Sequence, residues 1–174
     1  MNPETIRRNI LDKATELDWQ IATAESCTGG MVAARLTDLP GSSAAVAGGL
    51  VTYSNTMKIR LLNVPSSCLE NYGAVSDETV SAMAQGCLKK TGAQLAVSIS
   101  GVAGPGGGSD DKPVGTVHFG LMAESDHQAQ CTKVIFDGTR EDVREQATDF
   151  ALHLLAEKLK DPFTLSHQQQ EETF

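Results

Sequence analysis

The sequence predicts an α/β fold, a single three-layer α/β/α domain with a mixed sheet. Segments with helical spacing of apolar residues alternate with short apolar segments along the 174 residues. The run from Leu95 to Ser100 is almost continuously apolar, as expected of a central strand buried on both faces. Two later candidate strands, 114–122 and 130–136, are separated by the polar turn 124–127, which indicates an antiparallel hairpin. We therefore expect parallel and antiparallel strand pairs in one sheet.

The chain is predicted to begin with a helix followed by a short strand. Asn2 is a suitable helix cap, and Pro3 fits the first turn, where its missing N–H costs nothing. Apolar residues then recur at helical spacing: Ile6, Ile10, Leu11, Ala14 and Leu17. The segment 21–24 is short, apolar and flanked by polar residues, so we interpret it as a strand.

The next segments predict a helix, a strand and a further short helix. Helical spacing returns over 31–39 and stops at Pro40-Gly41. The residues 46–54 are apolar and partly β-branched, which favours a strand. Asn55 is expected to cap a short helix that Pro65 ends.

Two longer helices complete the prediction. Ser76 caps the first, and the acidic residues after Ser76 match the positive end of this helix. The helix extends to about Thr91, before Gly92. Thr139 caps the second, which closes the domain. Its apolar residues lie on one side: Val143, Ala147, Phe150, Ala151, Leu154 and Leu155. We expect the domain to span residues 1–160 and the polar residues 161–174 to form a disordered tail.

The composition excludes some classes of binding partner. The net charge is −8 and there is no lysine-rich run, which argues against nucleic acid and against an anionic membrane surface. The first ten residues lack the apolar core of a signal peptide, and no apolar run is long enough to span a bilayer. We therefore expect a cytoplasmic protein. Its four cysteines, without paired spacing, are expected to be free thiols.

The sequence AESCTGG at 24–30 lies where a predicted strand passes into a predicted helix. A helix start has unpaired backbone N–H groups and partial positive charge, which suit an anion or a developing oxyanion. The glycines would let a ligand approach the backbone closely. A simpler interpretation is that Ser26 or Thr28 only caps the helix and the glycines ease packing.

A second stretch, SISGVAGPGGGSDDKPVGTV at 98–117, favours a functional site at 24–30 over a simple helix cap. Together the two stretches resemble the CinA C-terminal family, whose members include the nicotinamide mononucleotide deamidases. Further motifs occur in the family's order: Pro40-Gly41-Ser42-Ser43, Val51-Thr52-Tyr53-Ser54-Asn55 with Lys58, Tyr72-Gly73-Ala74-Val75-Ser76, and Phe136-Asp137-Gly138-Thr139-Arg140 with Arg144. The resemblance extends from about Glu4 to Lys160.

The resemblance implies an amidohydrolase that converts nicotinamide mononucleotide to nicotinate mononucleotide and ammonia. Such a reaction needs a nucleophile, a base, donors for the oxyanion and an acid for the leaving ammonia. Ser26 is the candidate nucleophile, with the family pattern placing Lys58 as base and Tyr53 as proton relay beside it. The expected oxyanion donors are backbone N–H groups of Cys27, Thr28 and Gly29.

Simpler roles remain open for the same side chains. Tyr53 can be a half-buried strand aromatic and Lys58 a solvated helix charge. Cys27 is the rival nucleophile, because a thiol at a helix N-terminus is acidified, yet no histidine is clearly placed to assist it. We expect Cys27 instead to pack as a small apolar residue and to contribute its N–H. A Cys27 acyl hydrolase is therefore a weaker hypothesis than the Ser26 amidohydrolase.

The glycine-rich loop predicts a cradle for a phosphate or ribose, or else a hairpin that binds nothing. Its glycines permit conformations that turn successive N–H groups inward. The residues expected to contact substrate are Gly101, Gly104, Gly107, Gly108, Lys112, Arg140 and Arg144. The two arginines, one helical turn apart, are expected to face the same way and to grip a phosphate. We expect Glu25 to pair with one of these cations.

No metal or other cofactor is expected, because the histidines and cysteines do not cluster at ligand spacing. The expected partner is a small nucleotide, with a homo-oligomer implied by the resemblance. Two departures from the family suggest an alternative: Ala45-Val46 stands where an aromatic pair is common, and Thr56-Met57 where Glu-Ala is frequent. A relative that has lost the aromatic face for a pyridinium ring could bind a nucleotide without turning it over.

Overall fold

A computed structural model describes residues 2–162, which form a mixed five-stranded sheet between two layers of helices. The predicted tail lies outside the described residues, apart from 161 and 162. The strand order is β2-β1-β3-β4-β5, so the apolar strand β3 is central, as predicted. Strand β1 pairs in parallel with β2 and β3, whereas β3, β4 and β5 pair antiparallel. The strand bounds are β1 Ile21–Glu25, β2 Val46–Val51, β3 Leu95–Gly101, β4 Thr116–Ala123 and β5 Gln130–Ile135.

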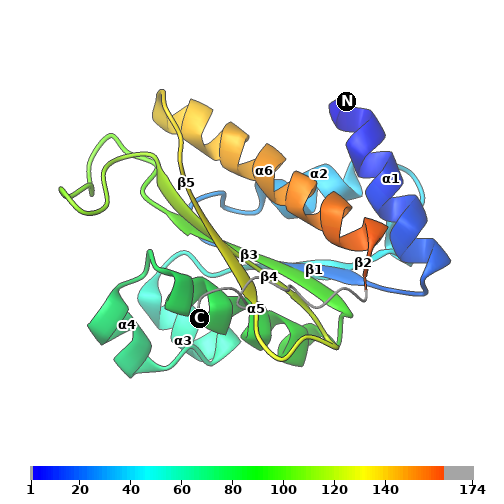
Figure 1. Ribbon diagram of the computed structural model, residues 1–174, viewed down its shortest axis with the longest axis horizontal. Helices are drawn as coiled ribbons and strands as arrows, with labels where there is room; N and C mark the ends of the chain where they lie inside the picture. The colour runs from blue at the N-terminus through cyan, green and yellow to red at the C-terminus, as the bar shows by residue number, and fades with distance from the viewer. Residues whose placement is uncertain (1, 163–174) are drawn as a thin grey trace, which may run out of the picture.

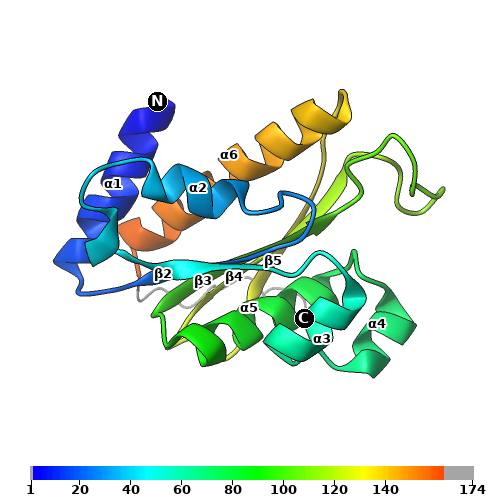
Figure 2. The ribbon, with the colours of Figure 1, turned by 180° about the vertical axis from the view of Figure 1, so that it is seen from behind.

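Each face of the sheet is covered by three α-helices (Figures 1 and 2). One layer consists of α1 Pro3–Glu16, α2 Met31–Thr37 and α6 Arg140–Lys160, and the other of α3 Asn55–Leu62, α4 Ser66–Tyr72 and α5 Asp77–Thr91. Two clusters of buried apolar residues fill the two interfaces. The α/β fold and the mixed sheet are therefore confirmed. Within the described residues, no helix has the length and apolar character that crossing a bilayer requires.

Local signals fix most helix ends as predicted. The side chains of Asn2, Ser76 and Thr139 each accept a backbone hydrogen bond at the start of α1, α5 and α6. One expectation was wrong, and one helix was missed. Ser54, not Asn55, caps α3, since its hydroxyl accepts from the N–H of Met57. Pro65 does not merely end that helix, because it is also the N-cap residue of α4, which the sequence did not predict.

The carboxyl ends of three strands meet at one edge of the sheet. Glu25 at the end of β1 is in register with Val51 of β2 and Ile99 of β3. The loop between β3 and β4 projects from this edge (Figure 1). In open α/β sheets, ligands bind in the crevice outside the carboxyl ends of parallel strands.

A glycine sets the distance between α3 and α5. Gly86 is buried in α5, and a β-carbon built on it would overlap the carbonyl oxygen of Leu62, the last residue of α3. No other residue type fits this helix contact without a shift of one helix. The position of α3 above the sheet therefore depends on the missing side chain at Gly86.

Candidate active site

The turn Ser26–Gly30 connects β1 to α2 and lies at the carboxyl edge of the sheet. The N–H of Ser26 donates to the carbonyl of Ile99 (2.9 Å), which extends the β1–β3 ladder by one residue. Gly29 and Gly30 have φ of 65° and 102°, a region that residues with a β-carbon rarely adopt. These glycines reverse the chain so that α2 can begin at Met31.

Glu25 caps α2 from within the core, which corrects the expectation that it pairs with Arg140 or Arg144. Its fully buried carboxylate accepts from the N–H groups of Gly30, Val32 and Ala33 at 2.9–3.2 Å. The hydroxyls of Thr23 (3.0 Å) and Thr28 (2.7 Å) donate to it as well. Neither Ser26 nor Thr28 caps the helix, because the N-cap residue is Gly30. The positive end of α2 is therefore already neutralised by a carboxylate.

Lys58 reaches from α3 to Ser26. Its Nζ lies 2.9 Å from Ser26 Oγ, 2.9 Å from the carbonyl oxygen of Thr52 and 3.3 Å from that of Tyr53. Lys58 is the largest fully buried side chain among the described residues, and only 8 % of Ser26 is exposed. The sequence alone also allowed a solvated lysine, and this geometry excludes that interpretation.

Burial lowers the pKa of the Lys58 amine from 10.5 to about 8. The cause is desolvation, which disfavours the ammonium form. The three oxygens around Nζ fit either form of the amine. An ammonium can donate to all three, whereas a neutral amine can donate to the two carbonyls and turn its lone pair to the proton of Ser26.

Tyr53 lies at the rim of the site, with 59 % of the residue exposed. Its hydroxyl accepts from Nη2 of Arg140 at 2.9 Å, and Nη1 of the same guanidinium donates to the carbonyl of Gly104 at 2.7 Å. Arg140 therefore bridges the segment after β2 and the glycine-rich loop. The Tyr53 carbonyl, rather than its phenol, contacts the Ser26–Lys58 pair: Ser26 Oγ lies 3.5 Å from it.

Arg144 holds the turn that follows Ser26. Its Nε donates to the carbonyl of Cys27 (3.1 Å) and its Nη2 to the carbonyl of Thr28 (3.2 Å). The C=O and N–H of a trans peptide point in opposite directions, so this contact orients the N–H of Thr28 away from Arg144. The N–H of Gly29 already donates to the carbonyl of Ser26 at 3.1 Å. Cys27 and Thr28 are thus better placed than Gly29 to supply a donor, and both N–H groups also face the thiol of Cys27.

The thiol of Cys27 is poorly suited to act as a nucleophile. Burial raises its pKa to about 11, although nearby backbone N–H groups and Lys58 act in the opposite direction. The residue is 5 % exposed and packs in the core cluster beneath α2. A thiol that stays protonated near neutral pH is a weak nucleophile. All four cysteines are free thiols.

The glycine-rich loop is tied on both sides. Arg140 contacts Gly104 from the α6 side, and Nζ of Lys112 donates to the carbonyl of Tyr72 (2.9 Å) on the α4 side. Gly104 and Gly107 have positive φ, whereas a β-carbon on Gly101 or Gly108 would collide with β4 or with the segment before it. Arg140 and Arg144 line one hollow together, but Glu141 and Glu145 line it too.

The residues Ala45 and Val46 lie away from Ser26. Val46 begins β2 and pairs with Ile21 at the start of β1, so it is separated from Ser26 by the length of the strand, about 16 Å. Ala45 is fully buried in the core cluster against α1 and α2. Ala45 and Val46 lie at the amino end of β2, whereas Ser26 lies at the carboxyl end of β1, which is the opposite edge of the sheet. The idea that these two residues remove an aromatic face from the site of the same chain is therefore wrong.

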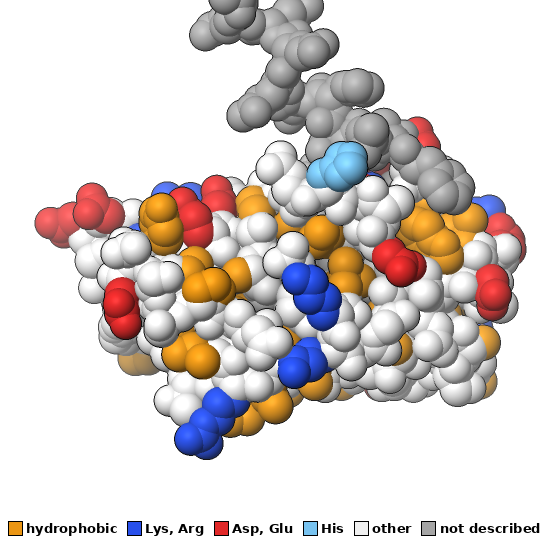
Figure 3. Space-filling model, turned by 90° about the horizontal axis from the view of Figure 1, so that it is seen from below, with side chains coloured by type: hydrophobic (Ala, Val, Ile, Leu, Met, Phe, Trp, Pro, Cys, Tyr) orange, Lys and Arg blue, Asp and Glu red, His pale blue; other side chains and the backbone are white. Residues whose placement is uncertain are grey.

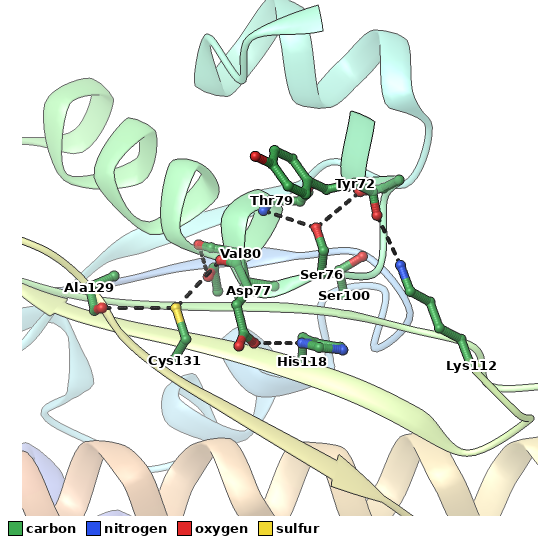
Figure 4. A network of polar contacts seen from close by, with 12 residues as sticks. Tyr72, Ser76, Asp77, Thr79, Val80, Ser100, Lys112, His118, Ala129 and Cys131 are labelled. Carbon is green, nitrogen blue, oxygen red and sulfur yellow. Dashed lines mark hydrogen bonds and ion pairs between the residues drawn. The ribbon is translucent and has the colours of Figure 1, made fainter. Parts of the chain in front are cut away.

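Three residues at this edge were not predicted as site residues: Thr52, Asp77 and His118. Nδ1 of His118 on β4 lies 2.6 Å from a carboxylate oxygen of Asp77 at the start of α5 (Figure 4). A histidine inside an otherwise apolar strand was the available signal. In the described part of the chain, no group of three or more His, Cys, Asp or Glu residues could hold a metal ion.

Comparison with known proteins identifies the family. A model of the CinA C-terminal domain matches residues 3–159. The chain belongs to the CinA C-terminal domain family. The CinA-like protein of Mycobacterium sp. (strain MCS) is 52 % identical over 141 residues, which are 81 % of this chain and 33 % of that protein. The CinA-like protein of Leptospira biflexa serovar Patoc is 49 % identical over 142 residues, 82 % of this chain and 34 % of the relative. The chain thus spans about a third of the length of these relatives.

Solved structures of CinA proteins share the fold along almost their whole length. A CinA superfamily protein from Klebsiella pneumoniae 700603 superimposes with a TM-score of 0.86 at 37 % identity, covering 92 % of this chain and 99 % of that one. A competence/damage inducible protein from Agrobacterium tumefaciens gives a TM-score of 0.84 at 40 % identity, covering 91 % and 95 %. The CinA fold therefore includes the strands and helices that bring Ser26 and Lys58 together here.

Proposed function

We propose that the protein hydrolyses the carboxamide of nicotinamide mononucleotide, releasing ammonia and nicotinate mononucleotide. The observation that carries the proposal is the 2.9 Å contact between Lys58 Nζ and Ser26 Oγ. A serine needs a base to act as a nucleophile at neutral pH, and a buried lysine with a pKa of about 8 can be one. The family resemblance supplies the substrate class.

In the proposed first step, neutral Lys58 takes the proton of Ser26 as Oγ forms a bond to the amide carbon. The carbonyl becomes an oxyanion, for which the N–H of Thr28, oriented through Arg144, is the proposed donor. When the intermediate collapses, the C–N bond breaks and the ammonium of Lys58 returns the proton to the leaving nitrogen, so that ammonia departs. An ester on Ser26 remains.

Water completes the cycle. Lys58, again neutral, takes a proton from a water molecule that attacks the ester carbon. The bond to Oγ then breaks, Ser26 regains a proton and the acid is released. The proposed contacts to the nucleotide are the loop glycines with Lys112, Arg140 and Arg144. Arg140 would exchange its contact with Tyr53 for one with the ligand.

The test is to incubate the purified protein with nicotinamide mononucleotide and to measure ammonia and the acid product together. We expect equal amounts of both. Binding without turnover by folded protein would contradict the hydrolase and support a nucleotide-binding relative. Cys27→Ser is the matched control: it is expected to keep most of the activity, because the thiol is buried and protonated. Loss of activity in this variant alone would favour the thiol as nucleophile.

The pKa of Lys58 predicts how activity depends on pH. Only the neutral amine can accept a proton, and its pKa is lowered to about 8, so the neutral fraction rises as pH increases through that value. We therefore expect kcat/KM to increase about tenfold per pH unit below about pH 8 and to level off above it. A profile measured from about pH 6 to 10 that stays flat would contradict a base with this pKa.

A further inference from the structure

A row of polar residues crosses the sheet beside the proposed nucleophile. Thr52, Ser26 and Ser100 each follow the in-register residues Val51, Glu25 and Ile99 of the three parallel strands. Ser100 in turn pairs directly with His118 on β4. We call Thr52, Ser26, Ser100 and His118 the polar row. At about 4.8 Å per strand, Ser26 and His118 are separated by about 10 Å.

The row faces the helical layer of α3 to α5. Ser26 contacts Lys58 on α3, Ser100 Oγ donates to the carbonyl of Ala74 at 2.7 Å between α4 and α5, and His118 contacts Asp77 on α5. Beyond the row, the same face of the sheet is packed by apolar residues, apart from Ser98, whose hydroxyl donates to the carbonyl of Val80. Seen from outside, this side of the molecule shows a few lysine and arginine side chains, with acidic ones as well, among hydrophobic and other uncharged groups (Figure 3). The polar row is therefore a local interruption of an apolar interface.

Polar atoms without a partner lie at both ends of the row. Three buried side-chain polar atoms in the described part of the chain lack a hydrogen bond: Thr52 Oγ1, Thr116 Oγ1 and His118 Nε2. Thr116 is two residues before His118 on β4, so its side chain lies on the same face. Leaving a buried polar atom unpaired costs stability, and such an atom at the end of the row is explained if a ligand satisfies it.

Asp77 determines which hydrogen bond His118 can offer. The 2.6 Å contact assigns the proton to Nδ1, so in the neutral ring Nε2 is an acceptor. Figure 4 shows that Nε2 lies on the side of the ring away from Asp77, toward the side where Ser100 and Lys112 lie. In the neutral ring, an acceptor in that place suits a ligand hydroxyl, whereas a carbonyl or phosphate oxygen would meet a lone pair.

We propose that the sugar of a bound nucleotide lies outside the carboxyl edge of the sheet, beside Ser100, and that one of its hydroxyl groups donates a hydrogen bond to His118 Nε2. The inference rests on the proposed function for the identity of the ligand. With the amide carbon at Ser26, the proposed order along the row is the ring and then the sugar, and Lys112 lies on the side of His118 that Nε2 faces (Figure 4). His118 is then a residue that selects for a sugar, while Asp77 positions its ring.

The experiment uses ribose 5-phosphate, which contains the sugar and phosphate but no amide. Its binding is measured by titration calorimetry and by long-range proton–nitrogen NMR of the four histidines, with the His118→Gln spectrum assigning the resonance. We expect the probe to shift Nε2 of His118. His118→Leu is expected to raise Kd about tenfold, and His118→Gln, which keeps an acceptor oxygen, about threefold. His153→Leu is the matched control, since His153 is exposed on α6 in the opposite layer.

The outcomes separate this inference from the proposed function. An unmoved His118 signal at saturating probe, no binding of the probe to the wild type, or an unchanged Kd in His118→Leu would overturn the sugar contact even in an enzyme that deamidates nicotinamide mononucleotide. A His118-dependent Kd without turnover of the mononucleotide would support the sugar contact and contradict the hydrolase. If His118→Leu does not fold, the NMR shift and the His118→Gln affinity still decide.

Discussion

Ser26→Ala is expected to lower kcat for nicotinamide mononucleotide by at least about 10⁴-fold, and Lys58→Met by a similar factor. Removing Oγ removes the atom that would bond to the amide carbon. Removing Nζ leaves that atom without a base 2.9 Å away, and serine alone is a weak nucleophile. KM should change less than kcat, because neither group is needed to hold the nucleotide. Initial rates of ammonia release over a range of substrate concentrations measure both quantities.

The double variant distinguishes a working pair from two independent effects. If Ser26 and Lys58 act in one step, the double variant should be no slower than the worse single variant. Lys89→Met is the matched control, because Lys89 is exposed on α5 and should leave the rate unchanged. A single variant that keeps most of the activity in folded protein would exclude its residue from the proposed role.

Glu25→Ala is expected to lower the free energy of unfolding by about 3–5 kcal/mol. The substitution leaves three helix N–H groups and two threonine hydroxyls without their acceptor in a fully buried place. The carboxylate also opposes the positive end of α2, and that interaction would be lost. Chemical denaturation followed by circular dichroism measures the change.

Two further variants show whether the loss comes from the acceptors. Glu25→Gln keeps one acceptor oxygen and should destabilise the protein by about half as much. Glu16→Ala removes an exposed carboxylate of α1 that pairs with Lys13, and it should change stability little. Equal stability of Glu25→Ala and the wild type would contradict the capping role of this carboxylate.

Most of the fold followed from the sequence because its signals are local. Caps at Asn2, Ser76 and Thr139 and the apolar run of β3 depend on residues close in the chain. The helix α4 was missed because Pro65 was interpreted only as the end of a helix. A proline can also precede the start of the next one, and Pro65 lies three residues after the last residue of α3. The choice between Ser54 and Asn55 as cap rests on one residue of register, which two equally suitable side chains cannot decide.

The candidate site was only partly predictable. The resemblance brought Ser26 and Lys58 into one hypothesis, but their contact depends on how α3 packs over the sheet. Glu25 was misassigned because an acid beside predicted cations suggests an ion pair. The better signal was the start of α2, where neither Gly30 nor an acidic first turn supplies a cap. His118 could not be placed, because its neighbours Asp77 and Ser100 are distant in sequence.

The contact at Gly86 means that the geometry of the proposed catalytic pair depends partly on a residue that does no chemistry. Lys58 is carried by α3, and the closeness of α3 to α5 requires a backbone without a side chain at this position. A methyl group added there would displace the helix, and with it the amine, by a fraction of an ångström or more. Proton transfer is sensitive to shifts of that size. We therefore expect a screen for variants with lost activity to identify positions on α5 whose side chains take no part in the reaction.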